Sequence, residues 1–467
     1  ARGLDRGSIL YGFAAGVCAG LMVLGRDQIA LLCVFILACY AIAQFLASDW
    51  RAKLSALMPV LSAGFVGGTL VVAVPLALTL TLADQSNRPE ISLDGAIGGS
   101  LPPFSLLSAV VANLYGVDGP LKEFWGPPAA HVWGENNLAL ARNMGAIYFG
   151  AVPLVGIMGG LVAFTQKRIR LFAGLVIVMA LYAVGKYTPF FALIYEVPGV
   201  DLYRRPADAT FPLAALLAIC GGYGVHVLLN NRPAFRWSMA LGLIIALFAA
   251  CIAVAVWKER LAQATLPLMI GAASLAAALI LLALLPRWMK RAPLIALCGI
   301  GLVMVVDLAV SNKPNESTAA SPDAYNVLRF GSENETLALI RRELAKTSAP
   351  DRRDRVELAA VDYNWPNAGL VHGFAHYLGF NPIRMKLYAD ATNAQDQIAV
   401  PEQRTFSPLY AGFKSPLADL MGVRLILSRY PLERMDPGFN PKDFVSLGQT
   451  KDAYVWQNPR ALPRVMM

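Results

Sequence analysis

The stretch WSMALGLIIALFAACIAVAVW, from Trp237 to Trp257, decides the fold class of this chain. It is 21 residues long and contains no charged side chain. A helix of about 20 apolar residues spans the hydrocarbon core of a bilayer and satisfies its backbone hydrogen bonds internally. The stretch therefore predicts a membrane-spanning helix.

Similar apolar runs recur over the first two thirds of the chain. Of its 467 residues, 56% are hydrophobic and 15% are charged, which is more apolar than a soluble protein. We predict a mainly α-helical, polytopic transmembrane bundle over residues 1–310, with about nine helices and a long outward loop near residues 83–145. The helices are expected near residues 9–25, 29–47, 57–82, 146–164, 169–185, 210–229, 237–257, 265–285 and 292–310.

Residues 311–467 have the composition of a soluble domain. SNKPNESTAASPDAY is typical of a linker, and ENETLALIRRELAK carries apolar residues at helical spacing. RVELAAV, VRLILS and AYVWQ favour β-strands. The tail is therefore predicted to be a soluble α+β or mostly β domain.

The distribution of Lys and Arg predicts the orientation. If nine helices alternate, the side that holds the first residues carries twelve cations in its short loops, and the other side carries six. The cation-rich side is expected to be cytoplasmic. The long loop, the segment around Arg205 and the tail are then expected to be extracytoplasmic. The net charge of +9 follows mostly from this bias, so we expect no nucleic-acid partner.

No metal site is predicted from spacing alone. All six cysteines fall in apolar runs, which indicates buried thiols. His372 and His376 are four residues apart, but Gly373 argues against a helical pair and no third ligand has a recognisable spacing. Asp307 lies in a membrane run, where an acid is either functional or an interfacial cap.

Two outward loops carry further candidates. LPPFSLLSAVVANLYG, residues 101–116, is too short to span and is either an interfacial or re-entrant helix or an ordered loop that packs on the bundle. Trp125 and Trp133 follow it and suit the headgroup level. In the second loop, YEVPGVDLYRRPADATF, the adjacent cations form either a phosphate clamp or ordinary headgroup contacts with ion pairs to neighbouring acids.

The segment YAVGKYTPFFALIYEVPGVDLYRRPADATF resembles one that precedes a membrane helix in the bacterial YfhO-like membrane proteins. Further similarity follows in order at LPPFSLLSAVVANLYG with FWGP, YFGAVPLVG, NAGLVHGFAHYLGFNPIRMKLY, LMGVRLILS and QNPRALPRVMM. It covers about residue 25 to the end. One departure is Asp208, where the family often has Arg.

That family is similar to GT-C-type glycosyltransferases, which take a sugar from a polyprenyl-phosphate carrier at the outer membrane face. The resemblance implies a multi-pass protein of the bacterial inner membrane with membrane lipid and a polyprenyl-phosphate-linked sugar as partners. It implies phosphate contacts from Arg204, Arg205 and Lys186, with Tyr203, Asp208 and Glu196 lining the substrate. A divalent metal is a possible cofactor for the leaving phosphate. The chain begins at ARGLDRGS without Met, so we expect sequence missing at both ends and the general base upstream, its identity unknown.

The alternative is a non-catalytic role, as a transporter or flippase of lipid-linked saccharides or as an assembly scaffold. A transporter is expected to place ionisable residues at helix midpoints and to show inverted halves. The apolar runs are almost free of charge and contain no visible repeat. This pattern favours chemistry at the membrane surface over passage through the bundle.

Overall fold

The computed structural model describes residues 3, 6–25, 27–46, 50–86, 92–117, 121–128, 142–197, 200, 205–230, 232–313, 322–347, 349, 354–359, 361, 364–376, 386–387, 416–435 and 439–463. The chain divides into two compact units. The first, here called the bundle, comprises Ala1–Ala77 and Glu90–Ala319. The second, here called the C-terminal unit, comprises Leu78–Pro89 and Ala320–Met467. Tyr203, Arg204 and Trp133 lie outside the described residues.

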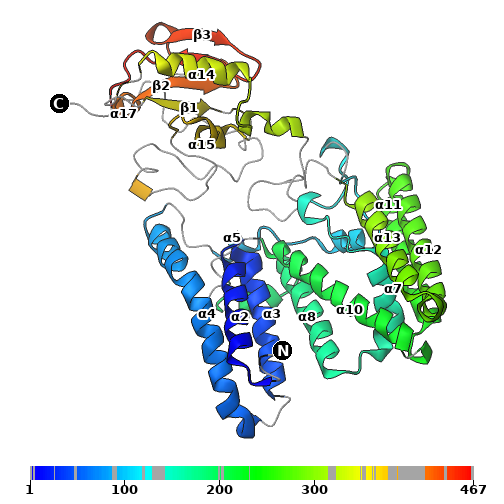
Figure 1. Cartoon of the computed structure of the whole chain (residues 1–467). Helices are drawn as coiled ribbons and strands as arrows, with labels where there is room; N and C mark the ends of the chain where they lie inside the picture. Colours follow the sequence, from blue (N-terminus) through cyan, green and yellow to red (C-terminus); the bar gives the residue numbers. More distant parts are fainter. Residues whose placement is uncertain are drawn as a thin grey trace. The chain divides into compact units, whose positions relative to one another are not determined.

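The bundle is built from helices joined by short 3-10 turns (Figure 1). Its α-helices are α2 (Ile9–Val23), α3 (Asp27–Leu46), α4 (Trp50–Asp84), α5 (Leu93–Ile97), α7 (Ala151–Gly160), α8 (Lys167–Val184), α9 (Phe190–Ile194), α10 (Thr210–Asn230), α11 (Trp237–Trp257), α12 (Leu261–Arg291) and α13 (Pro293–Ser311). Its 3-10 helices are η1 (Pro103–Ala109), η2 (Leu121–Glu123), η3 (Leu161–Ala163), η4 (Gly185–Tyr187), η5 (Pro206–Ala209) and η6 (Arg232–Ala234).

Six helices of the described chain are long and apolar enough to cross a membrane, so the chain is a membrane protein. They are Leu57–Leu82, Lys167–Tyr187, Pro206–Asn230, Trp237–Trp257, Leu261–Arg291 and Pro293–Ser311. Three further apolar helices are shorter: Ile9–Val23, Gln28–Ala43 and Ala151–Ala163. All nine predicted runs are therefore apolar helices, whereas the count of nine membrane crossings stays a prediction.

The shortest of these, α7, lies in the middle of the bundle. Nine of its ten residues are buried. It crosses α10 where both helices carry glycine, and a Cβ built on Gly156 would come within 2.5 Å of the Gly221 carbonyl oxygen. Such small residues allow two membrane helices to touch backbone to backbone. The apolar character of residues 146–164 is therefore explained by burial in protein as much as by contact with lipid.

Helices α2 and α4 meet in the same way. Gly12, Gly16 and Gly20 lie on one face of α2 at spacings of four residues, and this face packs against Val60, Gly64 and Gly68 of α4. By contrast, many large side chains elsewhere on α4 are exposed, including Phe65 at 75% and Leu70 at 71%. Apolar side chains exposed in this pattern are typical of a lipid-facing surface.

Residues 101–116 form neither an interfacial nor a re-entrant α-helix. They fold as η1 followed by turns, and Leu101, Val111 and Leu114 are fully buried in the main core of the bundle. The alternative expectation, an ordered loop packed on the bundle, is therefore correct. The loop is apolar because it supplies core side chains.

The C-terminal unit contains a four-stranded sheet in the order β1-β2-β4-β3 (Figure 1). Its strands are β1 (Arg355–Ala359), β2 (Val423–Ser428), β3 (Val445–Gln449) and β4 (Tyr454–Gln457), and its helices are η7 (Pro322–Leu328), α14 (Glu335–Ala345), η8 (Trp365–Asn367), α15 (Ala368–His372), α17 (Pro416–Leu420), α18 (Leu432–Met435) and η11 (Pro441–Asp443). β1 pairs with β2 in parallel, and the other two pairings are antiparallel. This confirms the predicted helix and three predicted strands.

Each face of the sheet has its own apolar cluster. On one face, α14 buries Leu337 and Ile340 against Val356, Leu358 and Leu425. The helix begins where the Asn334 side chain accepts the Leu337 N–H at 3.1 Å, an ordinary N-cap. On the other face, Ile426 packs with residues that include Leu432, Phe439 and Phe444. The C-terminal unit is therefore an α+β domain with a helix on one side of its sheet.

Candidate functional site

Segments that are far apart in sequence meet at one end of the bundle, here called the loop end. The Leu101 N–H donates to the Ala183 carbonyl at 2.8 Å, which ties the loop after α5 to the last turn of α8. The Ala207 N–H donates to the Gly99 carbonyl at 3.1 Å, which brings in the start of α10. The predicted alternation of nine helices likewise places these segments on one side.

Ser100 is the centre of this junction. It is fully buried, its hydroxyl donates to the Ile97 carbonyl at 2.5 Å, and its Oγ accepts the Lys186 N–H at 2.9 Å. Gly185 has φ +47°, and a Cβ there would lie 2.9 Å from the Ser100 Cβ. Only glycine fits this approach without strain. The backbone of Lys186 is therefore held in one position by a buried serine.

Arg205 is held beside the same loop. Its φ is +70°, a left-handed conformation that is uncommon for a residue other than glycine. The Asp208 N–H and the Gln28 side-chain amide both donate to its carbonyl, at 3.0 and 3.2 Å. A Cβ on Gly99 would lie 2.5 Å from the Arg205 Cα, so the arginine backbone packs directly against that glycine. Backbone strain of this kind is frequent at functional sites.

A cleft of about 330 Å³ opens next to Lys186. Its lining is mostly apolar, from Leu93 and Ile97 of α5 and from Pro189, Phe191 and Ala192 around α9. Lys186 and Tyr187 are exposed at its edge, and the lysine Nζ lies 5.3 Å from the centroid of the tyrosine ring. The arrangement offers one cation beside an apolar surface, as an amphipathic anion requires.

The structure brings together part of the set expected from sequence. Lys186 and Arg205 contact the consecutive residues Ser100 and Gly99, so the two cationic residues flank one short loop. Asp208 follows in η5, half-buried. Glu196 is exposed in the bend after α9. The remaining two expected residues, Tyr203 and Arg204, belong to the part of the chain that is not described.

Sequence reasoning missed the residues that hold these cations in place. Gln28 is buried at the start of α3, and its Nε2 lies 3.2 Å from the Arg205 carbonyl and 3.5 Å from the Tyr182 hydroxyl. A polar residue at the edge of an apolar run is the only sequence signal for it. Gly99 and Ser100 stand in the loop sequence GAIGGSLPP, where consecutive glycines indicate close backbone contact. Neither signal indicates that these residues contact Arg205 or Lys186.

The two histidines of the C-terminal unit do not form a metal pair. The His372 Nδ1 lies 2.8 Å from the Arg341 guanidinium, and its Nε2 lies 2.7 Å from the Val327 carbonyl. The His376 Nδ1 lies 3.1 Å from the Val356 carbonyl. Within the described residues, no group of three or more His, Cys, Asp or Glu is placed to hold a metal ion.

Asp307 acts as a cap for a neighbouring helix. Its carboxylate accepts the Ala151 N–H, the first of α7, at 2.8 Å, and the Tyr148 hydroxyl at 2.9 and 3.0 Å. An acid at this position satisfies a helix N-terminus and complements its dipole. Of the two roles expected from sequence, the structure supports the cap.

No protein-family model, curated protein or solved structure matches this chain. The geometry of the site is two cationic residues at one end of the bundle: Lys186, which is hydrogen-bonded through its N–H and lines an apolar cleft, and Arg205, whose backbone has a left-handed conformation.

Proposed function

We propose that the loop end binds the phosphate of a polyprenyl-phosphate-linked sugar, and that the protein transfers this sugar to an acceptor at the outer face of the bacterial inner membrane. The observation that carries the proposal is that Lys186 lines the 330 Å³ cleft and is bonded through its backbone to Ser100, while the backbone of Arg205 packs against the preceding residue, Gly99. Arg204, Tyr203, Asp208 and Glu196 remain proposed members of the same site.

The chemistry of the site fits a phosphate on an apolar chain. A guanidinium offers a planar fork of donors to phosphate oxygens, and an ammonium offers a compact charge. Both contacts strengthen near a membrane, where the local dielectric constant is low. Because the backbones of both residues are already fixed, ligand binding has to order only their side chains. As the leaving phosphate gains charge, such preorganised cations stabilise it further.

An acceptor hydroxyl also needs a general base. The described part of the chain offers a candidate close to the cleft. Asp94 follows Leu93 of the cleft lining, lies in the first turn of α5 and is exposed. We propose Asp94 as the carboxylate to test first, because the same short helix supplies two lining residues of the cleft, Leu93 and Ile97.

The alternative function is transport, and the hydrogen bonds of Asp307 help to decide between the two. An acid inside a membrane helix is the residue type that transporters use along a pathway. Here it is hydrogen-bonded to the start of α7 and to Tyr148, which gives it a structural task. This supports a surface reaction over transport.

The test is binding of undecaprenyl phosphate to the full-length protein in nanodiscs, followed by transfer of a radiolabelled hexose from the same carrier. Arg205→Asn removes the charge and keeps a residue that tolerates a left-handed backbone. Lys186→Gln removes the other charge. Each lost charge-assisted contact is worth about 1.5–3 kcal/mol, so affinity should fall roughly 10- to 100-fold per variant.

Arg260→Gln is the matched control, since Arg260 is an exposed cation immediately before α12. Asp94→Asn should keep carrier binding and lose transfer. Unchanged carrier affinity in the Lys186→Gln/Arg205→Asn double variant would reduce these residues to headgroup anchors and overturn the phosphate site. Intact binding without transfer of any hexose by the wild-type protein would overturn the enzyme and leave a carrier-binding protein.

A further inference from the structure

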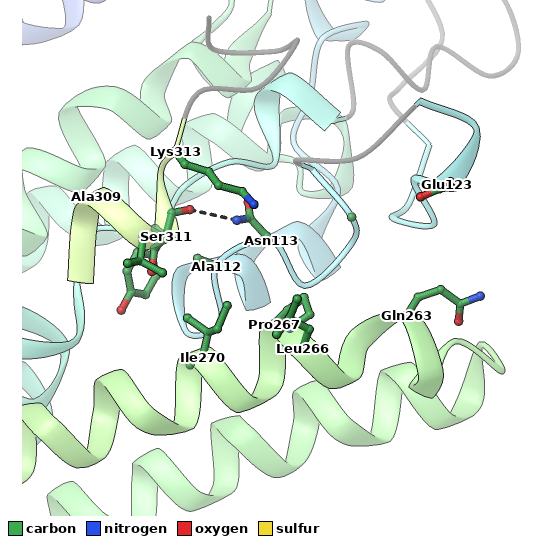
Figure 2. Close-up of a pocket in the computed structure, with 14 residues that line it drawn as sticks. Ala112, Asn113, Glu123, Gln263, Leu266, Pro267, Ile270, Ala309, Ser311 and Lys313 are labelled. Carbon is green, nitrogen blue, oxygen red and sulfur yellow. Dashed lines mark hydrogen bonds between the residues drawn. The ribbon is translucent and has the colours of Figure 1, made fainter. Parts of the chain in front are cut away.

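A second and larger cleft lies in the bundle, between the loop after η1, the first half of α12 and the end of α13. Its volume is about 490 Å³, within the range of small-molecule sites. Figure 2 shows its lining residues: the α12 side chains Leu266, Pro267 and Ile270 lie along one wall, and polar side chains stand around the opening.

The walls of this cleft are fixed by hydrogen bonds. The Asn113 side-chain amide donates to the Ser311 carbonyl at 3.1 Å, which joins the loop to the last residue of α13. Asn113 itself has φ +57°, a left-handed conformation that asparagine tolerates. Behind it, the Tyr148 hydroxyl is bonded to Asp307, so the tyrosine ring lines the cleft in one orientation. The cleft is therefore preformed.

Opposite charges stand on its two sides. Lys313 lies beside Asn113, whereas Glu123 and Gln263 are drawn on the other side of the opening (Figure 2). Glu123 is placed by the loop itself, because the Trp125 N–H donates to the Tyr115 carbonyl at 3.1 Å and the Glu123 carbonyl lies 3.2 Å from the Cβ position of Gly116. One side of the cleft thus suits an anion, and the other suits a cation.

Pro267 adds an acceptor to the acidic side. It lies inside α12 and has no N–H, so the carbonyl of Gln263 loses its ordinary partner four residues along the helix. Gln263 lines the cleft next to this position. A carboxylate with nearby amide and carbonyl oxygens binds a group that donates several N–H bonds, which is a primary ammonium. A quaternary ammonium would instead need an aromatic cage.

The apolar wall points to a lipid. Leu266 is 65% exposed and Val310 is 47% exposed, so the cleft continues onto apolar surface of two membrane helices. At the C-terminal end of α11, shortly before α12 begins, the Lys258 Nζ lies 3.9 Å from the centroid of the Trp257 ring. Such a pair is typical of the membrane interface. A soluble ligand would leave this apolar surface uncovered.

We propose that this cleft binds a phospholipid whose zwitterionic headgroup carries a primary ammonium, with its phosphate at Lys313 and Asn113 and its ammonium at Glu123 and Gln263. The acyl chains then lie against Leu266 and Ile270. This site is separate from the proposed glycosyl-transfer site and does not depend on it. It gives the bundle a selective contact with one class of membrane lipid.

The experiment is native mass spectrometry of the full-length protein in detergent with an equimolar mixture of phosphatidylethanolamine, phosphatidylcholine and phosphatidylglycerol that share the same acyl chains. The wild-type protein should prefer phosphatidylethanolamine about 10-fold, the equivalent of one charge-assisted hydrogen bond. Glu123→Gln should abolish the preference, and Lys313→Gln should weaken retention of all three lipids. Ile270→Trp fills the cleft without a change of charge and should remove bound lipid.

The controls are Glu259→Gln and Lys167→Gln, which make the same charge changes at exposed positions that do not line the cleft. They should leave lipid binding unchanged. Equal binding of the three lipids by the wild-type protein would overturn the proposal, as would equal losses in the controls. Competition by soluble phosphoethanolamine at the same concentration as the lipid would overturn the assignment to a lipid.

Discussion

The cap that Asp307 provides gives a sharp prediction about how the bundle is held together. Asp307 is 6% exposed, and its carboxylate accepts the Ala151 N–H, the Tyr148 hydroxyl and, at 3.4 Å, the Ser311 hydroxyl. Asp307→Ala leaves the first two donors in a buried site without their acceptor. Each such donor costs about 1–3 kcal/mol, so the variant should lose about 2–6 kcal/mol of unfolding free energy.

Two further variants separate the contributions. Asp307→Asn keeps one carbonyl oxygen and should lose about half as much as the alanine variant. Tyr148→Phe removes one donor and leaves the cap on Ala151, so it should lose about 1–2 kcal/mol. The Asp307→Ala/Tyr148→Phe double variant should be less destabilised than the sum of the singles, because the orphaned hydroxyl is gone.

The measurement is the unfolding free energy of the full-length protein in detergent, together with hydrogen exchange of the α7 amides. Glu259→Gln is the control, a carboxylate-to-amide change at an exposed position in the turn before α12. Faster exchange should be confined to α7 and its contacts. A loss below about 0.5 kcal/mol in Asp307→Ala, or strictly additive effects of the two substitutions, would refute this account of the cap.

Three further predictions concern packing, pH and topology. Gly16→Leu should destabilise the protein by about 1–3 kcal/mol in a thermal unfolding assay, because a side chain there meets the backbone of Gly64, whereas Gly174→Leu, with open space around it, should not. Burial lowers the pKa of His376 to about 4, below the unfolded value of roughly 6.5, so the folded state keeps this ring neutral. Its contribution of roughly 2–3 kcal/mol is complete above about pH 6.5 and is lost as the pH falls toward about 4, and urea titrations should show that His376→Asn lacks this loss. Cysteine introduced at residue 317 should react with an impermeant thiol reagent in intact cells while one at Gln166 stays unlabelled, and the reverse pattern would place the proposed site on the cytoplasmic side.

Hydropathy alone predicted the helices of the bundle, since a run of apolar residues has few alternatives to a helix in a membrane. It could not separate lipid contact from burial in protein. The runs 146–164 and 101–116 are apolar because they fill the centre of the bundle, as the full burial of Val155 and Leu114 shows. Charge counting predicts sidedness, which stays a prediction.

The C-terminal unit shows the same limit. β1, β2 and β4 were predicted because their sequences are apolar. Their side chains belong to the apolar clusters on the two faces of the sheet. β3 was missed because it is an edge strand whose residues are mostly exposed, so it lacks an apolar pattern. At the candidate site, residue types indicated Lys186 and Arg205, but no pattern could pair them with Ser100 and Gly99. Those contacts depend on how helices distant in sequence meet.

The glycine crossing between α7 and α10 has a mechanical consequence. Because their backbones are in contact at Gly156 and Gly221, the two helices cannot slide along each other without first separating. We therefore expect α7 and α10 to move as one rigid unit. Of this pair, α7 begins at Ala151, whose N–H is bonded to Asp307, and α10 begins at Thr210, which follows Arg205 and η5. A displacement of the turn at Arg205 is therefore expected to be transmitted through α10 and α7 to Ala151, whose N–H is bonded to Asp307.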